Sequence, residues 1–315
     1  MAAMSPLDPV FDTSFHTRLL HPKWWGSWCA LGLLSLLAFT PARLRDRFAD
    51  LVSPTLLRFS KKQAYIADTN LKICFPELDA AGRQALLLKS IRVGLKTFMG
   101  FGELSWRSKA RLTRRIKVTG WEHVEAARAA GKGIVFLTPH LGCFEVTAQY
   151  YSHRAPISVL YRPPKQAWLQ TMIEEGRARP QLYLAPADLS GVRTLIKALR
   201  RGEAVGMLPD QAPKVGEGRW IDFFGKPAYT MTLAARLSES GATVLMVWAE
   251  RLPGGAGYHF HLSRPTQALC GSTEERAAQI SHEIETLIRQ CPEQYLWGYN
   301  RYKRPRGVEA PPERD

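Results

Sequence analysis

The stretch Gly133-Ile134-Val135-Phe136-Leu137-Thr138-Pro139-His140-Leu141-Gly142-Cys143-Phe144-Glu145 decides the fold of this 315-residue chain. Its first six residues are a short run rich in strand-forming types, which predicts a buried strand. Pro139 stiffens the exit from that strand, and Gly142 permits a tight turn into a helix. Because ligand sites in open α/β sheets form beyond the carboxyl ends of strands, His140 and Glu145 mark a candidate site.

Strand and helix patterns alternate from this stretch toward the C-terminus. The predicted strands cover residues 157–161, 182–185, 204–208, 243–249 and 258–263. The predicted helices cover residues 61–75, 79–98, 121–130, 166–177, 191–201, 230–240 and 273–289. This alternation predicts an α/β protein whose largely parallel central sheet is flanked by helices.

Residues 24–42 form an uncharged, mostly apolar stretch near the N-terminus. As a helix they would reach about 28 Å, close to the roughly 30 Å of a bilayer core, although Pro41 is expected to end the helix early. Three tryptophans gather at one end, as in an interfacial aromatic belt. A membrane-associated helix, spanning or half-inserted, is favoured over a cleaved signal peptide or a buried core helix. We divide the chain into an N-terminal membrane-anchor region (1–45), a main domain (46–306) that carries His140 and Glu145, and a flexible tail (307–315).

The formal net charge of +15 predicts a polyanionic partner, which leaves open a nucleic acid, an anionic membrane and an acidic protein or substrate. Basic residues cluster at 43–47, 107–117 and 301–306. The three clusters together, beside the apolar stretch, favour an anionic surface. The number of cysteines, five, is odd, and none of them form a CxxC pair. A disulfide framework or a zinc site is therefore not expected, and the cysteines fit a protein of a reducing compartment. Cys143 is expected to be a packing residue.

The spacing of His140 and Glu145 suggests a general base and the acid that orients it. The Glu145 carboxylate is expected to hydrogen bond to one imidazole nitrogen, which fixes the tautomer and strengthens the other nitrogen as a base. The chain has no G-x-S-x-G, P-loop or G-x-G-x-x-G motif, so serine hydrolases, P-loop NTPases and dinucleotide binders lose support. The base would then act directly on a substrate hydroxyl. The spacing alone is weak, because about 0.7 matches are expected by chance at this composition.

Four further segments strengthen the interpretation. They are Val159–Pro164, Gly206–Gln211, Phe223–Pro227 and Cys291–Lys303. In this order, and together with the segment around His140, they make the chain resemble the late acyltransferases of lipid A biosynthesis, in the lysophospholipid acyltransferase superfamily. The resemblance runs from the apolar N-terminal stretch to about Arg306.

The resemblance implies transfer of a fatty acyl chain from acyl carrier protein to a hydroxyl of the Kdo-bearing lipid A precursor, at the cytoplasmic face of the bacterial inner membrane. His140 matches the base and Glu145 the acid that orients it. Arg162 matches an arginine that contacts phosphate or developing charge. Asp210 and Gln211 would arrange the site, and the stretch Phe223, Phe224 and Gly225 would shape the acyl pocket.

No metal and no cofactor other than the acyl carrier protein co-substrate is expected, because the thioester is already activated. The expected partners are acyl carrier protein, an anionic glycolipid and the membrane, but not nucleic acid. His259 and His261 are expected to be solvent-facing strand residues rather than metal ligands. Two alternatives stay open: an acyltransferase acting on a glycerophospholipid or another aminolipid, and a non-enzymatic basic protein that binds membrane or nucleic acid.

Overall fold

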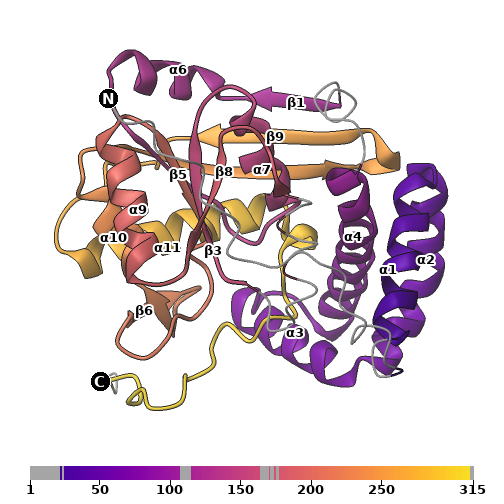
Figure 1. Ribbon diagram of the computed structural model, residues 1–315. Helices are drawn as coiled ribbons and strands as arrows, with labels where there is room; N and C mark the ends of the chain where they lie inside the picture. The colour runs from indigo at the N-terminus through magenta and orange to yellow at the C-terminus, as the bar shows by residue number, and fades with distance from the viewer. Residues whose placement is uncertain are drawn as a thin grey trace.

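Figure 1 shows the computed structural model, which describes residues 22, 25–106, 115–163, 170, 174 and 177–312. The α/β class is confirmed, since a central sheet lies among helices. The elements, in chain order, are α1 (Trp25–Phe39), α2 (Ala42–Phe59), α3 (Lys61–Cys74), α4 (Ala80–Trp106), β1 (Ile116–Thr119), α6 (Trp121–Ala129), β2 (Ile134–Leu137), α7 (Phe144–Ser152), β3 (Ile157–Tyr161), β4 (Leu182–Pro186), α9 (Leu189–Arg200), β5 (Ala204–Met207), β6 (Gly218–Phe223), β7 (Lys226–Met231), α10 (Leu233–Ser238), β8 (Thr243–Leu252), η3 (Pro253–Gly255), β9 (Gly257–Ser263), α11 (Thr273–Gln290) and η4 (Pro292–Gln294).

The main sheet has seven strands in the order β1-β9-β8-β2-β5-β3-β4. Its neighbours pair in parallel except β8 and β9, which form an antiparallel pair. The prediction of a largely parallel sheet is therefore confirmed. Strand β2 lies at the centre, and all four of its residues are buried, as its apolar sequence requires when helices cover both faces.

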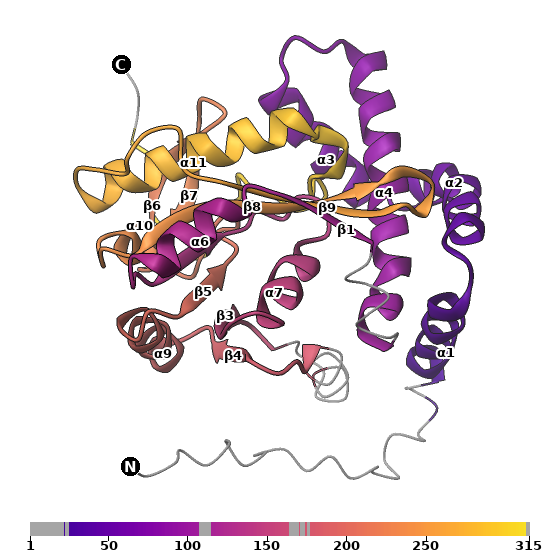
Figure 2. The ribbon, with the colours of Figure 1, turned by 90° about the horizontal axis from the view of Figure 1, so that it is seen from above.

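Helices cover both faces of the sheet, as Figure 2 shows for α11 on one side and α6 and α7 on the other. Alternate residues of each strand point to opposite faces and join different clusters. Val135 and Leu137 of β2 belong to the cluster that includes α9, α10 and α11, whereas Ile134 and Phe136 belong to the cluster beneath α6 and α7. The turn after β2 thus begins between two separate apolar cores.

Several elements differ from the sequence prediction. Edge strand β1 and the two-stranded hairpin β6–β7 were not predicted, and residues 230–231 belong to β7 although a helix was predicted over 230–240. The hairpin turn has positive φ at both Phe224 and Gly225, the geometry of a tight two-residue connection. The predicted helix over 166–177 lies mostly outside the described residues.

Helix α1 does not support the spanning form of the predicted membrane-associated helix. Helix α1 ends at Phe39, before Pro41, and its 15 residues reach only about 22 Å. Within the residues that the structure describes, no helix is long and apolar enough to cross a membrane. The predicted boundary at residue 45 falls inside α2, which packs together with α1 against α4.

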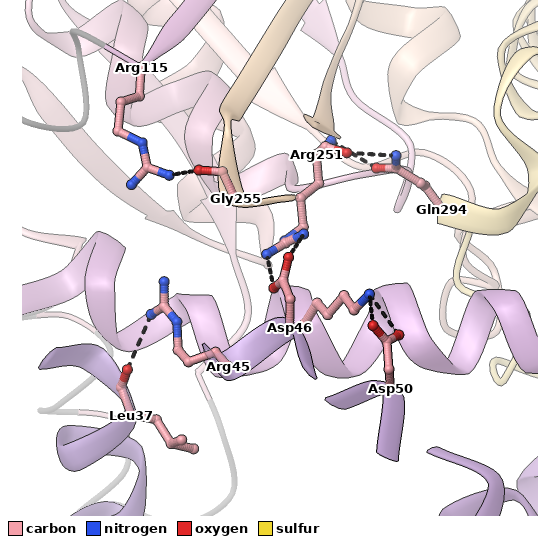
Figure 3. A network of polar contacts seen from close by, with 9 residues as sticks. Leu37, Arg45, Asp46, Asp50, Arg115, Arg251, Gly255 and Gln294 are labelled. Carbon is pink, nitrogen blue, oxygen red and sulfur yellow. Dashed lines mark hydrogen bonds and ion pairs between the residues drawn. The ribbon is translucent and has the colours of Figure 1, made fainter. Parts of the chain in front are cut away.

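Buried polar contacts join α2 to the main sheet (Figure 3). The guanidinium of Arg251, at the end of β8, forms an ion pair with Asp46 of α2, with Nη2 and Oδ1 2.6 Å apart. Both side chains are nearly enclosed. The side-chain amide of Gln294 accepts from the backbone N–H of Arg251 and donates to its carbonyl, at 2.9 and 3.1 Å. Helix α2 is therefore tied to the same strand that supports the turn after β2.

Candidate active site

The turn from β2 into α7 carries His140 and is fixed by backbone contacts on two sides. Gly142 has φ +64°, and a Cβ on it would lie 2.1 Å from the carbonyl oxygen of Ala249, so only glycine fits. The backbone N–H of Gly142 donates to the carbonyl of Gln294 at 3.0 Å, and that of Cys143 donates to Ala249 at 2.8 Å. The carbonyl of His140 accepts from Leu296 at 3.1 Å. The His140 backbone is thus held rigidly in place.

Both carboxylate oxygens of Asp210 form hydrogen bonds with His140. Its Oδ1 lies 2.8 Å from Nδ1 of the His140 ring, and its Oδ2 accepts from the His140 backbone N–H at 2.9 Å. With Nδ1 protonated toward Asp210, the Nε2 nitrogen carries the free electron pair of a base. Asp210 was predicted to arrange the site, and the structure shows it in contact with both the ring and the backbone of His140.

The sheet register explains why these two residues meet. Leu137 of β2 pairs with Met207 of the neighbouring parallel strand β5. His140 and Asp210 each follow their strand's paired residue by three positions, so the two strand ends deliver them to the same place. This is the carboxyl edge of the sheet, where sites of α/β folds form.

The surroundings of Asp210 favour its ionised form. Burial would raise the pKa of this enclosed carboxyl, but the positive charge of His140 and the two hydrogen bonds from His140 lower it below its ordinary value. The hydroxyl of Tyr295 also hydrogen bonds to Asp210. Burial, followed by the charge of Asp210, raises the pKa of Tyr295 well above its ordinary value, so the phenol remains a donor. Sequence reasoning gave Tyr295 no site role.

Gln211 contacts the other imidazole nitrogen of His140. Its amide Nε2 lies 3.2 Å from Nε2 of His140. Both ring nitrogens therefore contact side chains that are not nucleophiles. A substrate hydroxyl would have to take the place of the Gln211 amide to reach the base.

The prediction that Glu145 orients the imidazole is wrong, because Asp210 holds Nδ1. Glu145 instead forms an ion pair with Arg177, whose Nε donates to Oε2 at 2.9 Å while its Nη2 contacts Oε1. Burial lowers the pKa of Arg177, but the hydrogen bond and charge of Glu145 outweigh this and raise it. The guanidinium also lies 5.2 Å from the ring centroid of Tyr161. Sequence reasoning did not single out Arg177.

An apolar cavity lies between α7 and the sheet, and its empty volume of about 620 Å³ includes space open to solvent. It begins next to the turn that carries His140, at Thr138 and at Phe144, whose ring centroid is 5.1 Å from that of His140. The Glu145–Arg177 pair lines it too. Its remaining lining residues are mostly apolar: Phe136, Thr147, Ala148, Gln149, Ile157, Val159, Leu160, Leu182, Gly206, Met207, Leu208, Val247 and Phe260. A mostly apolar lining with a few polar groups is the composition of a small-molecule site.

The other predicted site residues lie apart from this cavity. Arg162 is exposed just beyond the end of β3. Phe223 and Phe224 belong to the β6–β7 hairpin, where Phe224 packs against Phe75. Gly225 completes the turn. The structure thus places the hairpin in the core near α3 and α11, and the expected acyl-pocket role of these residues is not supported by their position.

Cys143 is fully enclosed beside Val146 and Ala249. Burial raises the pKa of its thiol to about 12. A thiol that stays protonated is a poor nucleophile. The position agrees with the prediction of a packing residue.

Comparison with known proteins assigns the chain to a family. The family model described as "Bacterial lipid A biosynthesis acyltransferase" matches residues 12–304. The chain belongs to the bacterial lipid A biosynthesis acyltransferases. It is 31% identical to an Escherichia coli "Lipid A biosynthesis lauroyltransferase" over 305 residues, covering 94% of this chain and 97% of the relative. It is 29% identical to a Haemophilus influenzae "Lipid A biosynthesis acyltransferase" over 291 residues, covering 91% and 90%. Membership in these lipid A acyltransferases supports acyl transfer in lipid A synthesis as its activity.

Proposed function

We propose that this lipid A acyltransferase moves a fatty acyl chain from the thioester of acyl carrier protein to a hydroxyl of the Kdo-bearing lipid A precursor. The observation that carries the proposal is the His140 ring, held by Asp210 on Nδ1 and lying next to Phe144, which lines an apolar cavity. Neither ring nitrogen of His140 contacts a nucleophilic side chain, which suits a base that activates a substrate hydroxyl directly. An apolar cavity suits an acyl chain.

In the proposed reaction the acceptor hydroxyl displaces the Gln211 amide from Nε2 of His140. Its proton passes to Nε2 while its oxygen attacks the thioester carbonyl carbon. The charge of the resulting imidazolium is stabilised by Asp210. When the tetrahedral intermediate collapses, the C–S bond breaks, and the leaving thiolate takes the proton from His140. The displaced Gln211 amide would then be the hydrogen-bond donor to the oxyanion.

The donor acyl chain would lie in the cavity under α7. The cavity starts at the turn that carries His140 and continues to Phe260 and Leu182. A chain inserted there would have its carboxyl end near the base. The Glu145–Arg177 pair would then stand at the polar end of the chain, and Arg162, exposed beyond β3, would contact a phosphate of the acceptor.

The N-terminal helices would hold the enzyme on the cytoplasmic face of the inner membrane. Leu36 and Phe39 of α1 and Leu51 and Phe59 of α2 have side chains 62–79% exposed, far more than apolar residues of a folded core. Exposed arginines at 43, 47 and 58 accompany them. Apolar side chains with basic neighbours are typical of helices that lie in an anionic interface.

The proposal is tested with the purified full-length chain in detergent, given acyl carrier protein thioesters of several chain lengths. The acceptors are the Kdo-bearing lipid A precursor and, in parallel, lysophosphatidate. We expect acylation of the first only, with activity reduced at least about 10²-fold in His140→Ala. His282→Ala, a matched change at an exposed histidine, should behave like the wild type.

Acylation of lysophosphatidate alone would favour the glycerophospholipid alternative. Full activity of His140→Ala would contradict the assignment of the base. Tight binding to lipid vesicles or nucleic acid, without acylation of any acceptor, would support the non-enzymatic alternative.

A further inference from the structure

Two histidines and one glutamate meet on one face of the sheet, away from the His140 site. His259 and His261 are two positions apart on β9, so both imidazoles stand on the same face. Glu250 of β8 pairs directly with His259 in the antiparallel register. The three side chains come together as a consequence of strand pairing. The expectation that the two histidines simply face solvent is therefore incomplete.

The donor atoms of these residues converge on one point. Nε2 of His261 lies 3.2 Å from Oε2 of Glu250, and Nδ1 of His259 lies 4.0 Å from the same oxygen. One donor atom from each residue lies within 4.8 Å of the other two. Ligands of a tetrahedral zinc ion stand about 3.3 Å apart, since each bond is about 2.0–2.1 Å. Small side-chain rotations would bring all three atoms to that separation.

Neighbouring side chains orient the two rings. Nε2 of His259 is 2.8 Å from Oγ1 of Thr119 on β1. A proton held on this nitrogen leaves Nδ1 free as a ligand, the arrangement that outer-shell partners of metal-bound histidines provide. The ring of His261 stacks on Trp248, with centroids 4.5 Å apart and planes 11° apart.

We propose that Glu250, His259 and His261 bind a divalent transition-metal ion, with zinc the best match to two imidazoles and a carboxylate. The side chains of Glu250, His259 and His261 are 31, 16 and 29% exposed, so the group is partly open to solvent. Water would complete the coordination. Lys117 pairs with His259 across the β1–β9 ladder, and its charge weakens the affinity of the site.

The bound ion would brace the part of the sheet that carries the catalytic turn. It would link β8 to β9, and through Thr119 it would also restrain β1. Glu250 lies between Ala249, whose carbonyl holds the N–H of Cys143, and Arg251, which is paired with Asp46 of α2. The ion therefore has a stabilising role rather than a catalytic one.

The test is metal binding by the purified full-length chain after chelation and dialysis. Equilibrium dialysis with Zn²⁺ should give one ion per chain, and Co²⁺ should produce visible absorption bands of low-symmetry coordination. Zn²⁺ should raise the unfolding temperature of the wild type, because it binds the folded state. The variants are His261→Ala, Glu250→Gln, Thr119→Val and Lys117→Ala, and the control is His282→Ala, a change at an exposed histidine outside the group.

We expect His261→Ala to weaken binding at least about 100-fold, and Thr119→Val about tenfold, as for an outer-shell partner. Lys117→Ala should tighten binding, and the control His282→Ala should leave it unchanged. Circular dichroism of each variant separates loss of the site from loss of the fold. Absence of stoichiometric Zn²⁺ binding and of Co²⁺ bands in the wild type would overturn the proposal, as would equal binding by a folded His261→Ala variant.

Discussion

The two sides of His140 each supply one carboxylate, and the two carboxylates differ in what they contact. On the polar side, Asp210 has a side chain only 1% exposed and binds both the ring and the backbone of His140. On the cavity side, Glu145 is paired with Arg177 and does not hold the ring. The sequence spacing points to Glu145, whereas strand order delivers Asp210. A sequence motif can therefore single out an acid near the site without showing what that acid contacts.

The largest effect is expected from Asp210→Asn. The His140 backbone N–H requires an acceptor, so the new amide would turn its oxygen there and place its NH₂ against Nδ1. This would move the ring proton to Nε2 and remove the base. We expect the rate of acyl transfer in single-turnover assays to fall roughly 10³-fold, with little change in fold, because a wrong tautomer disables a general base.

Asp210→Glu serves as the matched charge-preserving variant, and should lose less activity than Asp210→Asn if it keeps an acceptor near Nδ1. Near-normal turnover in Asp210→Asn would mean that Asp210 does not orient the His140 ring, and Glu145 would again be the candidate for that role.

A smaller effect is expected at the Glu145–Arg177 pair. Removing one partner leaves a mostly enclosed charge, since the side chains are 12 and 21% exposed. We expect Arg177→Met to reduce the free energy of unfolding by about 1–3 kcal/mol, less than for a fully buried pair. Activity should fall about 10- to 100-fold. Urea unfolding and steady-state kinetics measure the two effects.

The double variant Glu145→Gln/Arg177→Met distinguishes a structural role from a functional one. It should recover much of the stability, because neither charge remains unpaired. If activity recovers equally, the pair serves only the fold. We expect activity to remain low, since the proposed reaction places this pair at the polar end of the acyl chain.

Much of the His140 turn follows from sequence, because local patterns determine it. The apolar run of β2, the tight turn at Gly142 and the helix that starts at Phe144 all depend on neighbouring residues. The partner of His140 depends instead on which strand lies beside β2. Asp210 is 70 positions away, and only the pairing of Leu137 with Met207 brings it close. His140 and Asp210 each lie three positions after the last paired residue of a buried strand, and this equal spacing is the sequence signal that could have identified Asp210 as the partner.

The missed strands also have physical reasons. In β1 the exposed residues Lys117 and Thr119 alternate with half-buried ones over only four positions, a weak pattern. The β6–β7 turn places Phe224 at φ 51°, a conformation that bulky residues rarely adopt, so its sequence does not resemble the usual hairpin turn. Contacts from elsewhere stabilise it, including a hydrogen bond from the Phe224 N–H to Glu285 at 2.7 Å.

The cavity side can be tested by filling it. Ala148→Phe adds a ring on the face of α7 that lines the cavity, so less length remains for an acyl chain. We expect the preferred donor to shorten, with about a tenfold shift in the kcat/KM ratio of long to short thioesters, since a few methylenes of lost burial give this magnitude. Ala129→Phe, on the exposed end of α6, should leave the ratio unchanged. An unchanged ratio in Ala148→Phe would place the acyl chain elsewhere.

The smallest effect is expected at Cys143, which lies on the turn between the two sides. Its pKa of about 12 keeps the thiol protonated at pH 8, so the thiolate needed for alkylation is almost absent. Iodoacetamide at pH 8 should modify exposed Cys270 and spare Cys143, as measured by peptide mass spectrometry. Cys143→Ala should keep activity within about threefold of the wild type, because the change removes only one buried sulfur. A large loss of kcat with the fold intact would mean that the thiol takes part in acyl transfer, and the reaction would then need a covalent step that a base acting directly on the acceptor hydroxyl does not require.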